Sequence, residues 1–253
     1  DLAMQQAAGF QTALDAYLQD CIDSTDSCFL GSTVAEGEAR IEDLLASIDA
    51  TPLPAGGGRL LTSGNAFYGI ITPLYVRDYW YLLTEGLKSA LNGDGTTLML
   101  LADAYASRNP AGGGYLDNTM EANVAINCLD DGWSIPASKV ADQIPDFVEA
   151  SPVFGRVFAW ALVGCRGFGY PAAEPAPAVL AQGAAPILVI GTTRDPATPL
   201  QWAQALADQL ASGVLVTRDG DGHTGYNSGN QCVDDAVEGY LVDGTVPRDG
   251  LAC

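Results

Sequence analysis

The sequence of 253 residues predicts an α/β fold in two parts, a mainly helical cap over residues 1–180 and a strand–helix part over residues 181–253. The first part repeats apolar residues at helical spacing, whereas the second alternates two short apolar runs with two helical patterns. Such alternation is typical of parallel strands joined by helical crossovers. Two strands are too few for a parallel sheet that is covered on both faces. We therefore expect them to be the last two strands of a larger sheet, with the cap inserted ahead of them.

The helical part is expected to contain several separate segments. Apolar side chains from Phe10 to Cys21 fall on one helix face, and those from Ile41 to Ile48 repeat the pattern. A glycine- and proline-rich stretch, residues 52–58, interrupts the chain before an aromatic-rich region in which Pro73 is expected to open a helix. Further helices are predicted over residues 96–107, 118–128 and 136–161, the last one broken near Pro152.

The second part follows a stretch rich in proline and alanine, residues 170–186, that indicates a linker. After it we expect a strand at 187–190, a helix at 199–211, a strand at 214–217 and a helix at 232–242.

One ionisable residue follows each predicted strand. Asp195 stands in the loop after the first, and His223, the only histidine of the chain, follows the second in an Asp-Gly-Asp-Gly-His loop. A carboxylate that fixes the tautomer of an imidazole forms the acid and base of a nucleophilic triad, and a histidine pKa of about 6.5 suits proton transfer at neutral pH. We therefore predict Asp195 and His223 as catalytic. The alternatives are an ordinary turn at Asp195-Pro196 and a histidine with no catalytic part.

Three neighbouring residues bear on this pair. Thr198 either braces the Asp195 carboxylate through its hydroxyl or caps the helix that opens at Pro199. Asp219 and Asp221 share the loop of His223, and their spacing predicts turn-forming residues rather than the triad acid.

The nucleophile of such a triad is not evident. The chain contains no Gly-x-Ser-x-Gly motif, which presents the serine on a sharp turn between strand and helix. Among its serines only Ser134 has a glycine two positions before it, and Pro136 occupies the place of the second glycine. Ser134 is better explained as a helix cap, so we expect the nucleophile to lie outside this chain and the chain alone to be inactive.

Composition excludes several classes of function. The formal net charge is −20, with 31 acidic and 11 basic residues, which argues against nucleic acid or an anionic membrane surface as partner. No apolar run approaches the length of a membrane span. A single histidine and the absence of paired cysteine motifs argue against a metal site, and nothing indicates a cofactor.

The six cysteines predict disulfides in an exported protein, with buried reduced thiols as the alternative. Sequence alone does not choose among the possible pairings. Proximity favours Cys21 with Cys28 and Cys232 with Cys253, which leaves Cys128 with Cys165.

Several sequence blocks resemble the tripeptidyl-aminopeptidase-like serine peptidases, which are exported α/β-hydrolases typical of actinobacteria. The chain resembles the cap and the C-terminal core portion of that family. The resemblance is strongest in four C-terminal blocks and weaker in two cap blocks: Ile187–Pro199, Asp219–Tyr226, Cys232–Val237, Tyr240–Cys253, Gln5–Phe10 and Ala125–Asp130. It implies a bacterial, secreted or cell-envelope serine peptidase in which the nucleophile lies on an N-terminal portion that partners this chain.

The resemblance also implies a substrate, namely peptides with a free N-terminus from which tripeptides are released. A carboxylate in the cap would then pair with the α-ammonium group of the peptide. Asp130, Asp131 and Glu121 are the candidates because they lie beside Cys128, although for each one taken singly a solvated helix end is the favoured interpretation. Two other classes stay open: an esterase or lipase with the same Asp and His, and a non-catalytic remnant that binds peptides.

Overall fold

The structure is a computed structural model that describes residues 2–24, 27–171 and 178–253. The chain divides into two compact units, residues 1–175 and residues 176–253. The division lies close to the cap boundary expected at residue 180. Residues 172–177 of the expected linker lie outside the described residues.

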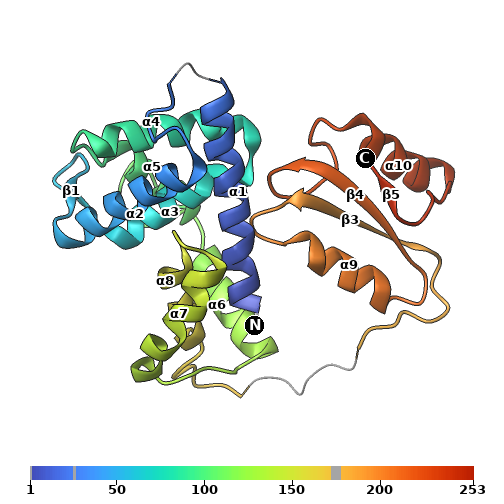
Figure 1. Ribbon diagram of the computed structural model, residues 1–253. Helices are drawn as coiled ribbons and strands as arrows, with labels where there is room; N and C mark the ends of the chain where they lie inside the picture. Colours follow the sequence, from blue (N-terminus) through green and yellow to red (C-terminus); the bar gives the residue numbers. More distant parts are fainter. Residues whose placement is uncertain (1, 25–26, 172–177) are drawn as a thin grey trace. The chain divides into compact units, whose positions relative to one another are not determined.

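The described part of the N-terminal unit is mainly helical and contains a short β-hairpin (Figure 1). Its elements are α1 (Leu2–Ser24), α2 (Val34–Ala50), β1 (Leu53–Pro54), β2 (Leu60–Leu61), α3 (Ser63–Ile71), α4 (Trp80–Leu91), α5 (Thr96–Tyr105), α6 (Thr119–Asp130), α7 (Val140–Ala150) and α8 (Gly155–Phe158), with 3₁₀ turns at Thr72–Tyr75, Arg77–Tyr79, Ala137–Lys139 and Ala159–Val163. The helices predicted at 96–107 and 118–128 are confirmed, and the segment 136–161 is broken beside Pro152 as predicted.

Helix α1 forms the centre of this unit because its predicted apolar face is buried from end to end. Phe10 on that face makes an edge-to-face contact with Phe154 at a centroid separation of 6.4 Å and lies beside Phe158 at 5.6 Å. Gln11, also buried, accepts hydrogen bonds from the Ser151 hydroxyl at 3.1 Å and from the Val153 N–H at 3.2 Å. Helix α1 is therefore joined to the α7–α8 segment by both apolar and polar contacts.

Three expectations for this unit are wrong in detail. The stretch 52–58 does not simply break the chain, since Leu53 pairs with Leu61 in an antiparallel hairpin. Pro73 does not open an α-helix but lies in the 3₁₀ turn after α3, where its fixed φ is tolerated. Ser134 caps no helix, because the next turn has Pro136 at its N-cap position.

The C-terminal unit is a small parallel sheet with one helix on each face (Figure 1). Its elements are β3 (Ile187–Arg194), α9 (Leu200–Gln209), β4 (Gly213–Asp221), α10 (Gln231–Asp243) and β5 (Leu251–Ala252). Strand β3 pairs in parallel with β4 from Ile187 opposite Gly213 onward, as the predicted crossover requires. Strand β5 adds a third parallel strand beside β4 that the sequence did not predict, because two residues carry no periodic signal.

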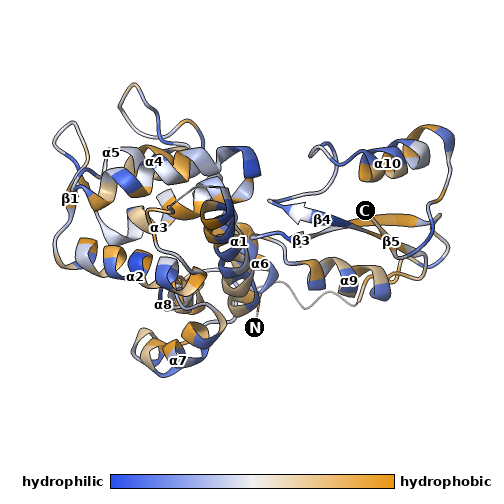
Figure 2. Cartoon of the chain, turned by 45° about the horizontal axis from the view of Figure 1, so that its top comes forward, coloured by the Kyte–Doolittle hydropathy of each residue, from blue (hydrophilic) through white to orange (hydrophobic). Residues whose placement is uncertain are grey.

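Alternate residues of the strands face the two helices. Val216 packs with Val233 and Val237 of α10, whereas a Cβ added to Gly191 would lie 2.6 Å from Leu200 of α9. Gly191 therefore allows the close approach of α9 to β3. Figure 2 shows that β4 is apolar along its middle and hydrophilic at its carboxyl end, where the charged residues of this unit gather.

The structure contains the disulfides Cys21–Cys28 and Cys232–Cys253, which proximity favours, and Cys128–Cys165, the pair that these two leave. The Cys232–Cys253 bond attaches the chain end after β5 to the start of α10. No helix among the described residues is both long and apolar enough to cross a bilayer.

Candidate active site

The carboxyl ends of β3 and β4 lie side by side, and each is followed at once by one candidate catalytic residue. Asp195 comes directly after β3, and His223 comes two residues after β4 ends at Asp221. Parallel pairing therefore brings together two side chains that are far apart in sequence. The imidazole Nδ1 lies 3.0 Å from each oxygen of the Asp195 carboxylate.

The carboxylate of Asp195 is buried, with 4% of the side chain exposed, and it is fully supplied with donors. Its Oδ1 accepts from the backbone N–H of Ala197 at 2.9 Å and of Thr198 at 2.8 Å. Its Oδ2 accepts from the Thr224 N–H at 3.1 Å. Burial by itself raises the pKa of Asp195, but the hydrogen bonds from His223 and from the backbone lower it below its ordinary value.

His223 is half-buried, and its environment favours the charged imidazole. The hydrogen bond to Asp195 raises the pKa of His223 above its ordinary value, against a smaller opposing effect of burial. An ionised carboxylate only accepts, so the neutral imidazole donates its Nδ1–H to Asp195. This tautomer leaves the lone pair on Nε2, the nitrogen that can accept a proton.

Thr198 braces the carboxylate, which was one of its two predicted roles. Its hydroxyl donates to Asp195 Oδ2 at 3.1 Å and lies 3.3 Å from Nδ1 of His223. The alternative role as helix cap is wrong, because Pro199 occupies the N-cap position of α9. Prolines on both sides of Ala197-Thr198 restrict the backbone that delivers these donors.

The loop that carries His223 has an unusual backbone. Gly222 has φ +100°, and Thr224, directly after the histidine, has φ +72°. A positive φ is uncommon for any residue with a Cβ and unfavourable for a β-branched one. The Thr224 carbonyl is held by the Thr192 hydroxyl of β3 at 3.2 Å, so contacts from the neighbouring strand help to maintain this conformation.

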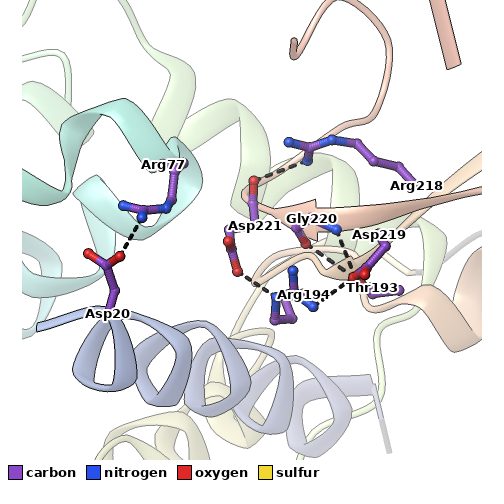
Figure 3. Close-up of polar contacts among 8 residues, drawn as sticks. All are labelled: Asp20, Arg77, Thr193, Arg194, Arg218, Asp219, Gly220 and Asp221. Atoms are coloured by element: carbon purple, nitrogen blue, oxygen red, sulfur yellow. Dashed lines mark hydrogen bonds and ion pairs between the residues drawn. The ribbon is translucent and has the colours of Figure 1, made fainter. Parts of the chain in front are cut away.

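A network of charged and polar side chains lies at the carboxyl ends of β3 and β4 (Figure 3). The guanidinium of Arg194 donates to Asp221 at 2.5 Å and to Asp219 at 2.8 Å. The Thr193 hydroxyl donates to Asp219 at 2.9 Å and receives the Gly220 N–H at 3.0 Å. Asp219 and Asp221 thus lie within β4 rather than in a turn, which corrects the sequence-based expectation. The reason is Arg194, whose partners sequence alone does not identify.

The three candidate substrate-binding carboxylates lie on the N-terminal unit and do not form one group. Glu121 lies in the first turn of α6, and Asp130 and Asp131 lie at the opposite end of that helix. All three are exposed. At about 1.5 Å of rise per residue, roughly 14 Å of helix separates Glu121 from Asp130. The structure therefore presents them as separate candidates.

The N-terminal unit also carries a hollow of about 960 Å³. Trp80, Tyr81 and Lys88 are among the residues that line it. The guanidinium of Arg77 lies 4.0 Å above the Trp80 ring and donates to Asp20 at 2.5 Å (Figure 3). Within the described residues, no group of three His, Cys, Asp or Glu side chains is placed to hold a metal ion.

Comparison with known proteins finds relatives that match nearly the whole chain. Residues 151–253 match a family model described as TAP-like protein. The serine protease Hip1 of Mycobacterium tuberculosis is 35% identical over 260 residues, which cover 99% of this chain and 49% of that protein. The carboxylesterase B of the same species is 38% identical over 256 residues, with 99% and 48% covered. The tripeptidyl aminopeptidase of Streptomyces lividans is 25% identical over 239 residues, with 93% and 43% covered. The chain spans about half the length of the curated relatives it matches.

Proposed function

We propose that Asp195 and His223 are the acid and base of a serine peptidase of the TAP-like α/β-hydrolase family, whose model matches residues 151–253. The observation that carries the proposal is the 3.0 Å contact between Nδ1 of His223 and a buried carboxylate that is saturated with donors. Relatives with serine protease and tripeptidyl aminopeptidase in their names support the reaction class.

In this mechanism His223 acts through Nε2. It takes the proton of the attacking serine hydroxyl and later returns it to the leaving amine. Asp195 stabilises the imidazolium that forms between these steps. The same interaction raises the pKa of His223 in the resting protein. Thr198 and the backbone N–H groups keep the carboxylate oriented toward Nδ1.

We place the nucleophilic serine outside these 253 residues, on an N-terminal portion of the same enzyme. The chain has no Gly-x-Ser-x-Gly motif. The two serines in the C-terminal unit have other partners: Ser212 donates to the Ala185 carbonyl at 3.1 Å, and Ser228 donates to the Gly225 carbonyl at 2.5 Å. On this proposal the chain alone does not hydrolyse peptides.

The proposed substrate is a peptide with a free N-terminus, from which short peptides such as tripeptides are released. A carboxylate on the N-terminal unit would bind the α-ammonium group, and Asp130, Asp131 and Glu121 are the candidates because they are exposed and acidic. We further propose an extracytoplasmic location. The three disulfides support it, since such bonds persist in oxidising compartments.

A second candidate function is hydrolysis of carboxylic esters. It is favoured by the carboxylesterase B relative, which is 38% identical over almost the whole chain. Ester and amide hydrolysis use the same acid and base, so Asp195 and His223 keep their roles.

The first test is fluorophosphonate labelling of the protein as isolated, read by intact mass. An adduct on a separate polypeptide that co-elutes supports the proposal, whereas an adduct on the 26.3 kDa chain overturns the external nucleophile. Absence of any adduct on protein that binds peptides favours a non-catalytic remnant.

The second test compares variants of the active protein on a tripeptide amide with a free N-terminus, its N-acetylated form and a matched ester. His223→Ala is expected to lower kcat by several orders of magnitude, with exposed Asp208→Asn as control. Unchanged turnover by His223→Ala would contradict the triad. Preference for the ester regardless of the free N-terminus would favour the esterase.

A further inference from the structure

Arg218 of β4 is a buried arginine with no part in the proton transfer described above. Only 9% of the residue is exposed, although arginine is almost never buried without partners. It lies in β4, five residues before His223, on the strand that leads into the histidine loop. Its guanidinium is therefore in a position to act on that loop.

The guanidinium holds the loop at both ends through backbone carbonyls. Nη1 donates to the Asp221 carbonyl at 3.0 Å, directly before the loop, and Nη2 donates to the Ser228 carbonyl at 3.3 Å, directly after it (Figure 3 shows the first of these). One planar fork thus joins two points that flank His223. A lysine carries its donors on a single nitrogen and cannot reproduce this geometry.

The packing around the guanidinium leaves little room for another arrangement. A Cβ added to Gly220 would lie 2.7 Å from Cζ of Arg218. A Cβ added to Gly225, inside the loop, would lie 2.5 Å from Ile190 and 3.8 Å from the Cβ of Arg218. The Nε of Arg218 is buried without a hydrogen-bond partner among the described atoms. An unpaired buried donor costs free energy, so an arginine that only filled space here would be unfavourable.

The loop that carries His223 requires stabilising contacts from outside because two of its residues have unfavourable backbone conformations. Thr224 has φ +72° and Asn227 has φ +57°, both in the region that residues with a Cβ rarely adopt. Such conformations persist where surrounding contacts determine them. The two carbonyls bound by Arg218 lie on either side of this segment.

We propose that Arg218 is the positioning residue for His223, holding loop 221–228 in the conformation that keeps Nδ1 on the Asp195 carboxylate. It does not touch the imidazole, so it acts through the loop backbone. The importance of this for catalysis rests on the proposed function, but the positioning itself is a property of the chain alone.

The test uses the single histidine of the chain as a site-specific probe. In the ¹⁵N-labelled chain, the imidazole signals give the pKa and the tautomer of His223 without any substrate. Arg218→Met is expected to lower the pKa of His223 toward its ordinary value, because the imidazole is no longer held on the Asp195 carboxylate, and to populate the Nε2–H tautomer. Exposed Arg248→Met in the same unit is the matched control and is expected to change neither.

Two further variants decide the outcome if Arg218→Met does not fold. Arg218→Lys keeps the charge but loses the fork, and Gly220→Ala displaces the guanidinium while leaving it present. Either one, folded by circular dichroism, is expected to lower the pKa of His223 and to speed amide exchange in residues 222–228. An unchanged pKa and tautomer in a folded variant would overturn the proposal. Because no hydrolysis is measured, this failure is distinguishable from failure of the proposed function.

Discussion

The backbone N–H of Thr224 donates to Oδ2 of Asp195 at 3.1 Å, so the residue after the histidine is tied to the same carboxylate as the imidazole itself. The imidazole and its own loop backbone therefore share one anchor. Thr224 makes this contact with a positive φ of +72°. The shared anchor restricts the histidine more closely than a single side-chain contact would.

Removing the charge of Asp195 is expected to change the titration of His223. In the folded chain the hydrogen bond and charge of Asp195 raise the pKa of His223. Asp195→Asn should lower that pKa to its ordinary value or below, since burial then acts alone. Imidazole NMR of the single histidine measures it, and Asp208→Asn on α9 is the control. A pKa that stays raised would show that another group, not Asp195, is responsible.

The same shift predicts how stability depends on pH. Because the folded pKa of His223 is raised, its stabilising contribution is fully present below about pH 6.5 and is lost as the pH rises through the folded pKa. In Asp195→Asn this contribution should be absent. Thermal melts of both proteins between pH 5 and pH 8 check this, and the difference between their melting temperatures is expected to narrow toward pH 8.

Glu38 of α2 is expected to oppose stability as the pH rises. Burial and the neighbouring Asp15 and Glu42 raise its pKa from 4.5 to about 7. Between these two pH values the folded chain retains a proton on Glu38 that the unfolded chain releases. The stability contributed by protonated Glu38 is therefore fully present below pH 4.5 and is lost as the pH approaches 7. Glu38→Gln should melt about 2 °C above the unchanged chain at pH 7.5, with the gain vanishing near pH 4. Exposed Glu149→Gln is the control, and a gain independent of pH would contradict the assignment.

Gln11 is expected to be important for the stability of the N-terminal unit. Gln11→Ala leaves the buried N–H of Val153 and the hydroxyl of Ser151 without their acceptor. The expected loss is about 1–3 kcal/mol in the free energy of unfolding. Urea unfolding followed by circular dichroism measures it. Gln19→Ala, an exposed position of the same helix, should cost much less, and equal losses would show that helix propensity alone is involved.

Gly155 of α8 is expected to tolerate no side chain. A Cβ at this position would lie 2.0 Å from the Phe147 carbonyl oxygen, and a backbone atom cannot move aside as a flexible side chain does. Gly155→Ala should destabilise by about 1–3 kcal/mol or more. Gly64→Ala in α3 meets nothing within 4 Å and should be neutral or stabilising. Comparable melting temperatures for the two variants would refute the close approach.

Much of the fold was accessible from the sequence because its signals are local. The apolar face of α1, the linker texture and the two strand runs each depend on residues within one element. The positions of Asp195 and His223 followed from the same signals, since a loop directly after a parallel strand has only one edge of the sheet to occupy. Spacing favoured the disulfides Cys21–Cys28 and Cys232–Cys253, and the structure adds Cys128–Cys165.

Features built from contacts between distant residues required the tertiary structure. Strand β5 exists because its two residues lie beside β4, and Asp219 and Asp221 stay in the strand because Arg194 lies across from them. Nothing near Arg218 in the sequence distinguishes it from an exposed arginine.

The sequence by itself determined that a helical part precedes two parallel strands, one followed by an acid and the other by a histidine. Hydrophobic periodicity and the position of a loop depend only on residues that are close together in the sequence. Only the tertiary structure decided which groups saturate Asp195 and what holds the loop of His223. Two of those contacts join β3 and its following loop to the loop after β4, across a crossover, and the third joins Arg218 of β4 to Ser228; in each case packing, and not the sequence nearby, chooses the acceptor.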